Sequence, residues 1–441
     1  MASPFEQLVT DAVAHHEAGR LDEAEAAYRD ALGLAPGHPA VTHNLGVIAA
    51  ARGRHREALA HFDAAIAAEP QYASAHYNRA SALQALGQSR DALQSLARVC
   101  AIDPGHYDAH RALGFLWLAE GDRGRALDHF SRTYELRRGD DRSGIAAKSL
   151  TWAVRDKLLH DAEQFRYLAA RRRDRPRFEA LARNYETVAE GVPDEAVPLS
   201  DEQLDALGDD YNTAIHVGAA PEIAGRAVSA RPDRETLMER YRKRECGAVW
   251  FDDLLTTASL AALKRHLAES TIWHDFSHIG GFVASYLEDG LACPLLLQIA
   301  DEIRGAFPDL LNDHPLSQAW AFKGLKATAA IDAHADDAAV SINFWVTPDH
   351  ANRNPDGGGL VVCRAPPPAA WQVQGYDADK AAISAFLDRH AADSLVVVPY
   401  RENRAVLFES RLFHRSGATD FATGYENHRI NLTLLFGRHT N

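Results

Sequence analysis

Two residues in the C-terminal half, His334 and Asp336, are separated by a single position, and a second histidine, His414, follows much later in the chain. Residues two apart in an extended segment point to the same side, so His334 and Asp336 are expected to share one face. Two imidazoles and one carboxylate form a facial triad that leaves three positions of an octahedral metal open, which suits non-haem Fe(II). This spacing predicts a catalytic metal centre made of His334, Asp336 and His414.

An arginine and an asparagine near this triad are candidates for binding a cosubstrate. Arg429 follows His414 on the next expected strand, and a guanidinium there can hold a carboxylate that extends beyond the metal through two parallel hydrogen bonds. Asn343 shares the strand parity of Ser341, and two roles stay open for it: a hydrogen bond to the cosubstrate or one to the backbone. Arg429 and Asn343 are therefore the predicted cofactor-binding residues.

Four neighbouring residues have less specific interpretations. Trp345 shares the parity of the site, but its large ring favours the hydrophobic core. Asp337 has the wrong parity for the metal and is expected to be solvated or ion-paired. Tyr286 and Lys323 precede the histidine motif, where early strands could present them, and the sequence assigns a role to neither.

The segments that carry these residues are short runs rich in β-branched and aromatic residues, separated by Gly, Pro, Asn and Asp. Such runs predict the antiparallel strands of a sandwich or jelly roll. They are AWAFKGL, AVSINFWVT, GGGLVVC, SLVVVPY, RAVLFES and RINLTLLFG. In the last run Arg429, Asn431 and Thr433 alternate with apolar residues, and a polar row in a core-forming strand is costly unless partners satisfy it. We interpret this row as the lining of a site inside the barrel.

A regular repeat runs through the first third of the chain. Glycine, alanine and proline recur at one constant interval, at Gly19, Gly53, Gly87 and Gly121, at Ala24, Ala58, Ala92 and Ala126, and at Pro36, Pro70 and Pro104. In each unit one helical stretch ends near the glycine and a second ends before the proline. The alanine allows close approach of helices, and a bulky residue fills the space between neighbours. Each unit is therefore predicted to be a helix pair.

This period resembles the tetratricopeptide repeat, and the pairs Leu45-Gly46 and Leu113-Gly114 match its first-helix signature. The resemblance covers about residues 5–140. The fourth unit departs from it, because Arg138 and Gly139 stand where the proline is expected, which suits the last unit before a change of fold. Such arrays leave a concave groove, so the repeats are expected to dock a peptide or protein, and a purely architectural or dimerising role is the alternative.

Three domains are expected from these patterns. Residues 1–140 form the tetratricopeptide repeat array, residues 141–240 keep helical patterning without the period and form a helical connector, and residues 241–441 form the jelly roll. The predicted fold class is multidomain α + β, with an N-terminal α-solenoid and a C-terminal double-stranded β-helix.

Composition narrows the classes of partner. The 441 residues carry 47 Lys+Arg and 61 Asp+Glu, for a net charge of -14, which disfavours attraction to nucleic acid or to an anionic membrane. No apolar run approaches the roughly 20 residues that a membrane span needs. The four cysteines are far apart, which fits a reducing compartment. We expect a cytoplasmic protein that binds neither nucleic acid nor membrane.

The order of His334, Asp336, His414 and Arg429 within a jelly-roll pattern resembles the Fe(II)/2-oxoglutarate-dependent dioxygenases of the prolyl-hydroxylase-like superfamily. The chain is most similar to bacterial members in which tetratricopeptide repeats precede the oxygenase domain. The resemblance covers about residues 240–441. The resemblance implies that the triad binds Fe(II) and that Arg429 holds the distal carboxylate of 2-oxoglutarate, with O2 as cosubstrate. It also implies hydroxylation of a substrate, and we expect this to be a peptide or protein recruited by the repeats.

Two alternatives stay open. Two histidines and an aspartate also bind Zn(II) with a water in the open position, so a metal hydrolase is possible from the same residues. The chain could also be a non-catalytic repeat scaffold with a structural jelly roll. The substrate, the site of oxidation and the oligomeric state do not follow from the sequence.

Overall fold

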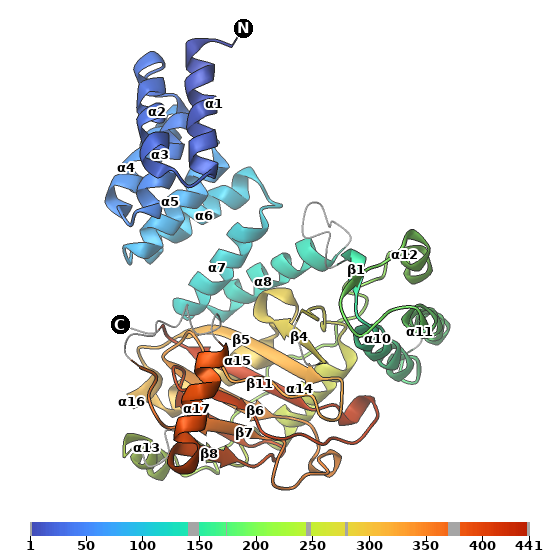
Figure 1. Cartoon of the computed structure of the whole chain (residues 1–441). Helices are drawn as coiled ribbons and strands as arrows, with labels where there is room; N and C mark the ends of the chain where they lie inside the picture. The colour runs from blue at the N-terminus through green and yellow to red at the C-terminus, as the bar shows by residue number, and fades with distance from the viewer. Residues whose placement is uncertain are drawn as a thin grey trace. The chain divides into compact units, whose positions relative to one another are not determined.

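The computed structural model describes residues 2–139, 150–172, 174–243, 248–277, 281–368 and 380–438. The chain divides into two compact units, Met1–Leu116 and Trp117–Asn441. The first unit is helical, and the second combines helices with antiparallel sheets (Figure 1). This is the mixed α + β organisation that the sequence predicts, whereas the domain boundaries at residues 140 and 240 stay predictions.

The first unit is a stack of helix pairs. Its helices are α1 (Pro4–Glu17), α2 (Leu21–Leu34), α3 (Pro39–Ala51), α4 (His55–Ala68), α5 (Ala73–Ala85), α6 (Ser89–Ile102) and the first part of α7 (Tyr107–Ala119). Gly19, Gly53 and Gly87 each lie in the turn within a pair at a φ of 72°, 71° and 73°, a conformation that side chains oppose. The predicted helix pairs are confirmed.

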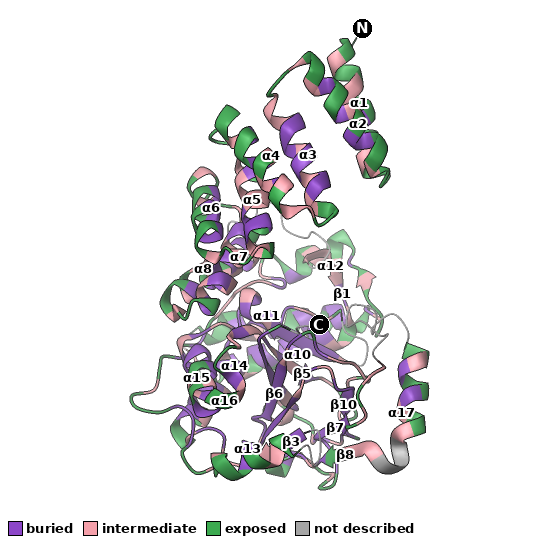
Figure 2. Ribbon diagram, turned by 90° about the vertical axis from the view of Figure 1, so that its left-hand side faces the viewer, coloured by how far each residue is buried: buried purple, intermediate pink, exposed green. Residues whose placement is uncertain are grey.

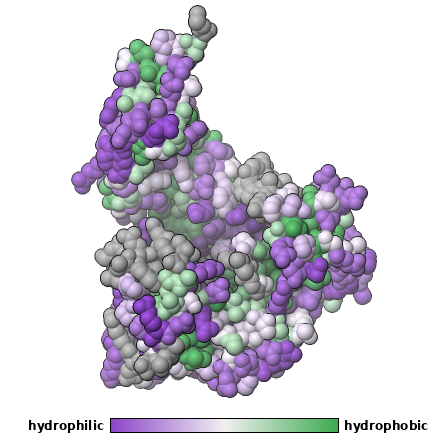
Figure 3. Space-filling model, viewed as in Figure 1, coloured by the Kyte–Doolittle hydropathy of each residue, from purple (hydrophilic) through white to green (hydrophobic). Residues whose placement is uncertain are grey.

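Small and bulky residues alternate in the packing of these pairs. The periodic alanines and the bulky residues four positions after them are buried: Ala24, Ala58, Ala92, Tyr28, Phe62 and Leu96. In α2, α4 and α6 buried residues follow one side of the helix and exposed residues cover the other, whereas α3 is mostly buried (Figure 2). Hydrophilic side chains cover most of the visible surface of this unit (Figure 3). Each helix pair therefore completes its core only by stacking on its neighbours.

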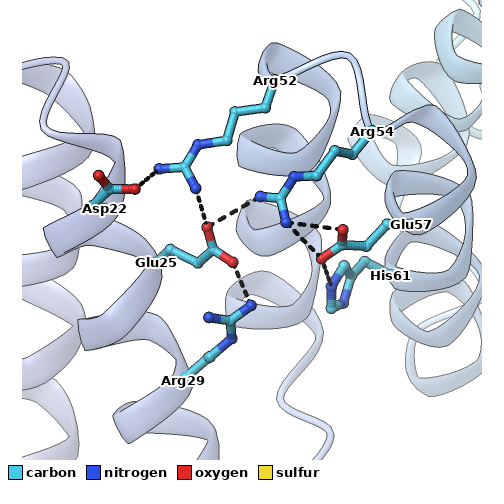
Figure 4. Close-up of polar contacts among 7 residues, drawn as sticks. All are labelled: Asp22, Glu25, Arg29, Arg52, Arg54, Glu57 and His61. Atoms are coloured by element: carbon cyan, nitrogen blue, oxygen red, sulfur yellow. Dashed lines mark hydrogen bonds and ion pairs between the residues drawn. The ribbon is translucent and has the colours of Figure 1, made fainter.

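A charged network joins the first two repeats (Figure 4). Glu25 on α2 is buried and accepts hydrogen bonds from Arg29 of its own helix, from Arg52 at 2.6 Å and from Arg54 at 3.1 Å. Arg54 also pairs with Glu57 of α4 at 2.9 Å. Glu25 is thus the acceptor that the three guanidinium groups share, while Asp22 pairs with Arg52 and Glu57 with Arg54.

Replacing this carboxylate is expected to loosen the boundary between the repeats. In Glu25→Gln the three arginines lose their shared anion, and hydrogen bonds to charged groups contribute about 1.5–3 kcal/mol. We expect amides of α2–α4 to exchange hydrogen at least about tenfold faster in the variant, measured by mass spectrometry on the full chain. Glu23→Gln, an exposed glutamate of the same helix, should leave exchange unchanged. Equal exchange in the two variants would contradict this role.

The second unit begins with helices. They are α8 (Arg123–Arg138), α10 (Arg155–Ala169), α11 (Arg175–Glu190), α12 (Asp201–Leu207) and α13 (Arg234–Arg242), with a small sheet of β1 (Trp152–Ala153) and β2 (Val197–Pro198). Phe165, Leu168, Leu181 and Tyr185 form a core between α10 and α11. Ser200 and Gln203 form a capping box at the start of α12. Residues 208–233 contain no helix, so the predicted connector is only partly helical.

Two antiparallel sheets follow. The larger has the order β3-β9-β6-β11-β5-β4, and the smaller has the order β10-β7-β8. Their strands are β3 (Ala248–Phe251), β4 (Phe282–Tyr286), β5 (Leu316–Gly324), β6 (Val340–Trp345), β7 (Leu360–Cys363), β8 (Leu395–Val398), β9 (Ala405–Glu409), β10 (His414–Ser416) and β11 (Ile430–Phe436). All six strand runs expected from the sequence are strands, and β3, β4 and β10 are additional.

The two sheets share one hydrophobic core. Trp345 of β6 and Phe408 of β9 pack in one cluster with Leu360 and Val362 of β7 and Val398 of β8. The strands of the larger sheet consist of buried and intermediate residues and have no exposed one (Figure 2). The remaining helices are α14 (Thr257–Glu269), α15 (Pro294–Ala306), α16 (Pro308–Leu311) and α17 (Lys380–Ser394), with short 3-10 turns η1 (Leu287–Asp289), η2 (Asp349–Ala351) and η4 (Tyr425–Asn427). Every helix of the described residues is too short or too polar to cross a membrane.

A buried ion pair fastens α8 to the end of β4. The guanidinium of Arg138 donates to both carboxylate oxygens of Asp289 in η1, at 2.8 and 2.7 Å. The side chains are 1% and 3% exposed. Although Asp289 is buried, Arg138 lowers the pKa of its carboxyl to about 2, so the pair is ionised at neutral pH. The arginine that replaces the expected proline of the fourth repeat thus has a structural partner outside the repeat.

Candidate metal centre

The structure brings together the three predicted metal ligands. Among the residues that it describes, His334, Asp336 and His414 form the one group of at least three histidine, cysteine or acidic side chains close enough to hold an ion, with one ligand atom of each within 4.8 Å of the others. Nε2 of His334 lies 3.7 Å from Oδ1 of Asp336, and Nε2 of His414 lies 3.5 Å from Oδ2. These separations leave room for an ion that contacts each atom at about 2.0–2.2 Å.

Backbone pairing between distant segments sets the positions of the two histidines. His334 and His414 form an isolated antiparallel bridge in which each amide donates to the other carbonyl, at 3.0 and 2.8 Å. His414 begins β10, which pairs with β7. His334 belongs to no named strand, so the expected strand at the His334-x-Asp336 motif consists of this bridge alone.

Second hydrogen bonds fix the tautomer of both histidines. Nδ1 of His334 lies 2.8 Å from the carbonyl oxygen of Asp332, and Nδ1 of His414 lies 3.0 Å from that of Leu412. A carbonyl can only accept, so each Nδ1 carries the proton and each Nε2 keeps its lone pair for a metal. Burial, with a contribution from His334, lowers the pKa of His414 to about 4, although Asp336 acts in the opposite direction. His414 is therefore neutral at pH 7, as a metal ligand must be.

The carboxylate is oriented by two serines. Ser341 donates to Oδ2 of Asp336 at 2.7 Å, and its hydroxyl also lies 2.8 Å from the hydroxyl of Ser410. The amide of Asp336 donates to the carbonyl of Ser410 at 2.9 Å. Ser341 lies on β6 and Ser410 follows β9, so the larger sheet holds this ligand.

Arg429 is held at the same pocket by backbone carbonyls. Its Nε donates to the carbonyl of Gly358 at 2.6 Å and its Nη2 to that of Gly359 at 3.3 Å. Gly358 has a φ of +77°, and a Cβ at position 359 would overlap the carbonyl oxygen of Val398. The glycines that precede β7 therefore supply the acceptors that position the arginine.

Arg429 is a buried cation with an unused donor. Its side chain is buried, and burial lowers the pKa of the guanidinium to about 10, which keeps it charged at neutral pH. In the described part of the chain its Nη1 has no hydrogen-bond partner. An ionised group that lacks a counter-charge is costly to bury. This site therefore fits the carboxylate of a bound molecule.

One pocket joins the metal ligands to Arg429. Its volume is about 20 Å³, and its lining includes the following residues: Trp320, Phe322, His334, Asp336, Asn343, Leu360, His414, Arg429, Asn431 and Thr433. The side-chain oxygens of Asn343 and Asn431 have no partner among the described residues. An unsatisfied buried polar atom costs about 1–3 kcal/mol, so these atoms and Arg429 together fit a polar ligand.

The structure places the other candidate residues as follows. Asn343 lines the pocket, whereas Trp345 is fully buried in the core shared by the sheets. Asp337 is exposed, as expected. Lys323 alternates on β5 with the pocket-lining Trp320 and Phe322 and so faces the opposite side of the sheet.

The side of the sheet opposite the pocket gives Lys323 an aromatic environment. Its ammonium lies 3.7 Å from the ring centre of Tyr425 and 5.1 Å from that of Trp273. Burial lowers the pKa of Lys323 well below its ordinary value. Lys323 is therefore a packing residue behind the site.

Sequence reasoning missed the supporting residues Ser341, Ser410, Gly358 and Gly359. Asn431 lines the pocket together with Arg429 and Thr433, as the polar row of this strand predicts. Its position two residues after Arg429, on the same strand face, is the one signal that pointed to the pocket. The carbonyls of the glycines and the hydroxyl of Ser410 reach the site through contacts between distant segments, for which the sequence has no local signal.

Comparison with known proteins identifies the repeats. The family model of the tetratricopeptide repeat matches residues 15–82 and 49–114. No curated protein matches the chain.

Solved structures match between about a quarter and a third of the chain. A MamA protein is 20% identical over 30% of this chain and 73% of its own, with a TM-score of 0.29. MamA from residue 41 of Desulfovibrio magneticus RS-1 is 25% identical over 32% of this chain and 78% of its own, with a TM-score of 0.29. The first tetratricopeptide domain of Spaghetti (RPAP3), bound to an HSP90 peptide, is 21% identical over 26% of this chain and 93% of its own, with a TM-score of 0.26. From the family match, the N-terminal helical region of this chain consists of tetratricopeptide repeats.

Proposed function

We propose that the chain is an Fe(II)- and 2-oxoglutarate-dependent dioxygenase that hydroxylates a peptide or protein recruited by its repeats. The observation that carries this proposal is the buried, charged Arg429, which lines the same pocket as the candidate metal ligands and whose Nη1 has no partner among the described residues. A metal hydrolase needs only the three ligands and a water. A second, carboxylate-binding position beside the metal is what a dicarboxylate cosubstrate needs.

The arrangement of strands supports a double-stranded β-helix. From β6 onward the chain alternates between the two sheets: β6 lies in the larger, β7 and β8 in the smaller, β9 in the larger, β10 in the smaller and β11 in the larger. The His334–His414 bridge extends the smaller sheet next to β10. Closing two sheets in this way leaves one open end for a site between them.

Different residues of the pocket would bind the metal and the cosubstrate. When bound, Fe(II) and 2-oxoglutarate supply the oxidative decarboxylation that activates O2 for hydroxylation. His334, Asp336 and His414 would hold the ion, and a set of only three ligands would leave positions for cosubstrates. Arg429 holds the distal carboxylate, and Asn343 donates to or accepts from the same molecule. Trp320 and Phe322 exclude water from one wall of the pocket.

The repeats support recruitment of a macromolecule. Tetratricopeptide arrays bind peptides or proteins on their stacked helices, and the first unit of this chain is such an array.

Purified protein supplied with Fe(II), 2-oxoglutarate and O2 should release succinate and CO2 even without substrate. No succinate from folded, iron-loaded protein would contradict the proposal.

Substitution of Arg429 should separate cosubstrate binding from metal binding. In Arg429→Met the charge-assisted hydrogen bonds to the carboxylate, about 1.5–3 kcal/mol, are lost. We expect the 2-oxoglutarate concentration for half-maximal succinate formation to rise about 10- to 100-fold while Fe(II) affinity stays unchanged. The control is Arg438→Met, which replaces an exposed arginine just after β11. An unchanged 2-oxoglutarate dependence in Arg429→Met would exclude this role.

A further inference from the structure

A large cavity formed by described residues of the second unit lies beside the candidate metal pocket. Its volume is about 1090 Å³. The end of α8, the β1–β2 region, β4 and the beginning of β5 contribute its walls, through residues such as Arg138, Trp152, Asp194, Phe282, Tyr286 and Gln318. These elements can be followed around β1 and β4 in Figure 1.

Strand register shows that the cavity and the metal pocket share one face of the larger sheet. On β5, Gln318 lines the cavity, and Trp320 lines the pocket two residues later, on the same face. On the neighbouring β4, Tyr286 pairs with Trp320, and Tyr286 lines the cavity.

The distance between the two spaces is small. Asn431 of β11, in the metal pocket, pairs with Phe322 of β5, which pairs with Ala284 of β4. Two strand spacings of about 4.8 Å separate β11 from β4. The ring of Phe322 lies 6.2 Å from that of Phe282, which lines the cavity. A chain bound in the cavity can therefore extend along this face toward the metal ligands.

The lining of the cavity has an excess of negative charge. Among the residues that the structure describes, six carboxylates contribute to it, against three cations: Asp156, Asp194, Glu195, Asp275, Glu288 and Asp289, against Arg137, Arg138 and Lys326. The cations already have carboxylates within reach, since Arg138 pairs with Asp289 and Lys326 pairs with Asp156 at 3.0 Å and with Asp194 at 3.4 Å. Burial lowers the pKa of His274 well below its ordinary value, so this ring adds no charge at neutral pH.

Apolar groups complete the lining. Trp152, Phe276, Phe282, Tyr286 and Leu325 contribute to the same walls. The phenol of Tyr286 donates to Asp275 at 3.0 Å, so a carboxylate and an aromatic ring stand side by side. Cations bind favourably at such places, through the carboxylate and through the ring face. Long aliphatic stems that end in a cation match both features.

We propose that this cavity binds a basic segment of the substrate, in which lysine or arginine alternates with apolar residues, and directs it to the candidate metal centre. This assignment of substrate class rests on the proposed dioxygenase function. The chain entering the cavity would place its cations against Glu195, Asp275 and Glu288 and its apolar side chains against the aromatic walls. Charge complementarity of this kind sets specificity and speeds association.

Peptide binding to the full chain tests this assignment without metal or cosubstrate. The probe is a fluorescein-labelled octapeptide that alternates lysine with leucine, and the comparison peptides carry glutamine or glutamate in place of lysine. Fluorescence anisotropy should give a dissociation constant at least about tenfold lower for the lysine peptide than for the glutamine peptide, and this difference should shrink at high salt. Equal affinity for the two, or preference for the glutamate peptide, would overturn the proposal.

Two matched double variants locate the binding. In Glu195→Gln/Glu288→Gln two carboxylates of the cavity are neutralised, and the lysine peptide should bind about tenfold more weakly. In Glu235→Gln/Glu239→Gln the same charge is removed from the exposed face of α13, and binding should not change. Equal loss in both variants would assign the affinity to net charge and overturn the proposal.

The result separates this proposal from the proposed function. Lysine-peptide binding that depends on Glu195 and Glu288, in a protein that forms no succinate, would support the cavity and contradict the dioxygenase. Succinate formation without selective binding of the lysine peptide would support the dioxygenase and contradict the assignment of the cavity.

Discussion

The variant Asp336→Ala is expected to turn over 2-oxoglutarate at least about 100-fold more slowly than the parent chain. Changes to residues that only orient a metal ligand already cost about 10- to 100-fold in affinity or activity, and Asp336 lies between the two histidines, 3.7 and 3.5 Å from their Nε2 atoms. Without the carboxylate, two neutral imidazoles hold the ion alone. Succinate formation at saturating 2-oxoglutarate, with Fe(II) content measured in parallel, gives the result.

The neighbouring aspartate provides the matched control. Asp337 is exposed and Asp336 is buried, so Asp337→Asn removes the same charge one residue away without touching the ligand set. Its turnover should stay within about twofold of the parent chain. If Asp336→Ala keeps its tryptophan fluorescence and its thermal unfolding but also keeps turnover, Asp336 does not bind the catalytic metal.

Breaking the buried pair between Arg138 and Asp289 is expected to have the largest effect on stability. Removing one partner of such a pair leaves an uncompensated buried charge and costs about 3–5 kcal/mol. The pair is bidentate and both side chains are almost fully buried. Arg138→Met should therefore lower the free energy of unfolding of the second unit by this amount.

Tryptophan fluorescence in urea isolates this effect, because all seven tryptophans lie at or beyond residue 117. Arg132→Met, on the same helix, removes an arginine that is 31% exposed and pairs with the exposed Glu135. Exposed pairs contribute less than about 1 kcal/mol, so this control should unfold at nearly the parent urea concentration. The double variant Arg138→Met/Asp289→Leu should recover most of the loss, since paired apolar residues replace a buried ion pair at little cost. Similar midpoints for both arginine variants would contradict the assigned role.

Features with a local or periodic signal could be predicted from the sequence. The repeat helices follow from glycines and alanines that recur at one constant interval, and the long strands follow from runs such as AVSINFWVT. Two of the three strands that were missed have weaker signals: β10 is only His414-Arg415-Ser416, and the FVASY run of β4 mixes large and small residues. These strands form because neighbouring strands pair with them, which the local sequence does not encode.

The candidate site divides in the same way. His334, Asp336, His414 and Arg429 could be chosen by residue type and order, and the structure brings all four to one pocket. The groups that hold these four side chains in place could not be predicted from the sequence. Gly358 accepts from Arg429 across 71 positions, and the hydroxyl of Ser410 contacts that of Ser341 across 69. Carbonyls are present at every residue, so only the fold decides which of them meets a guanidinium.

Anaerobic titration of the metal-free chain with Fe(II) and then 2-oxoglutarate tests the central claim most directly. Direct coordination of 2-oxoglutarate to the iron gives a weak metal-to-ligand charge-transfer band in the visible range. The account predicts that this band appears at one equivalent per chain in the parent protein and is absent from His334→Ala. A folded, iron-loaded protein that shows no band at saturating 2-oxoglutarate would contradict the dioxygenase assignment.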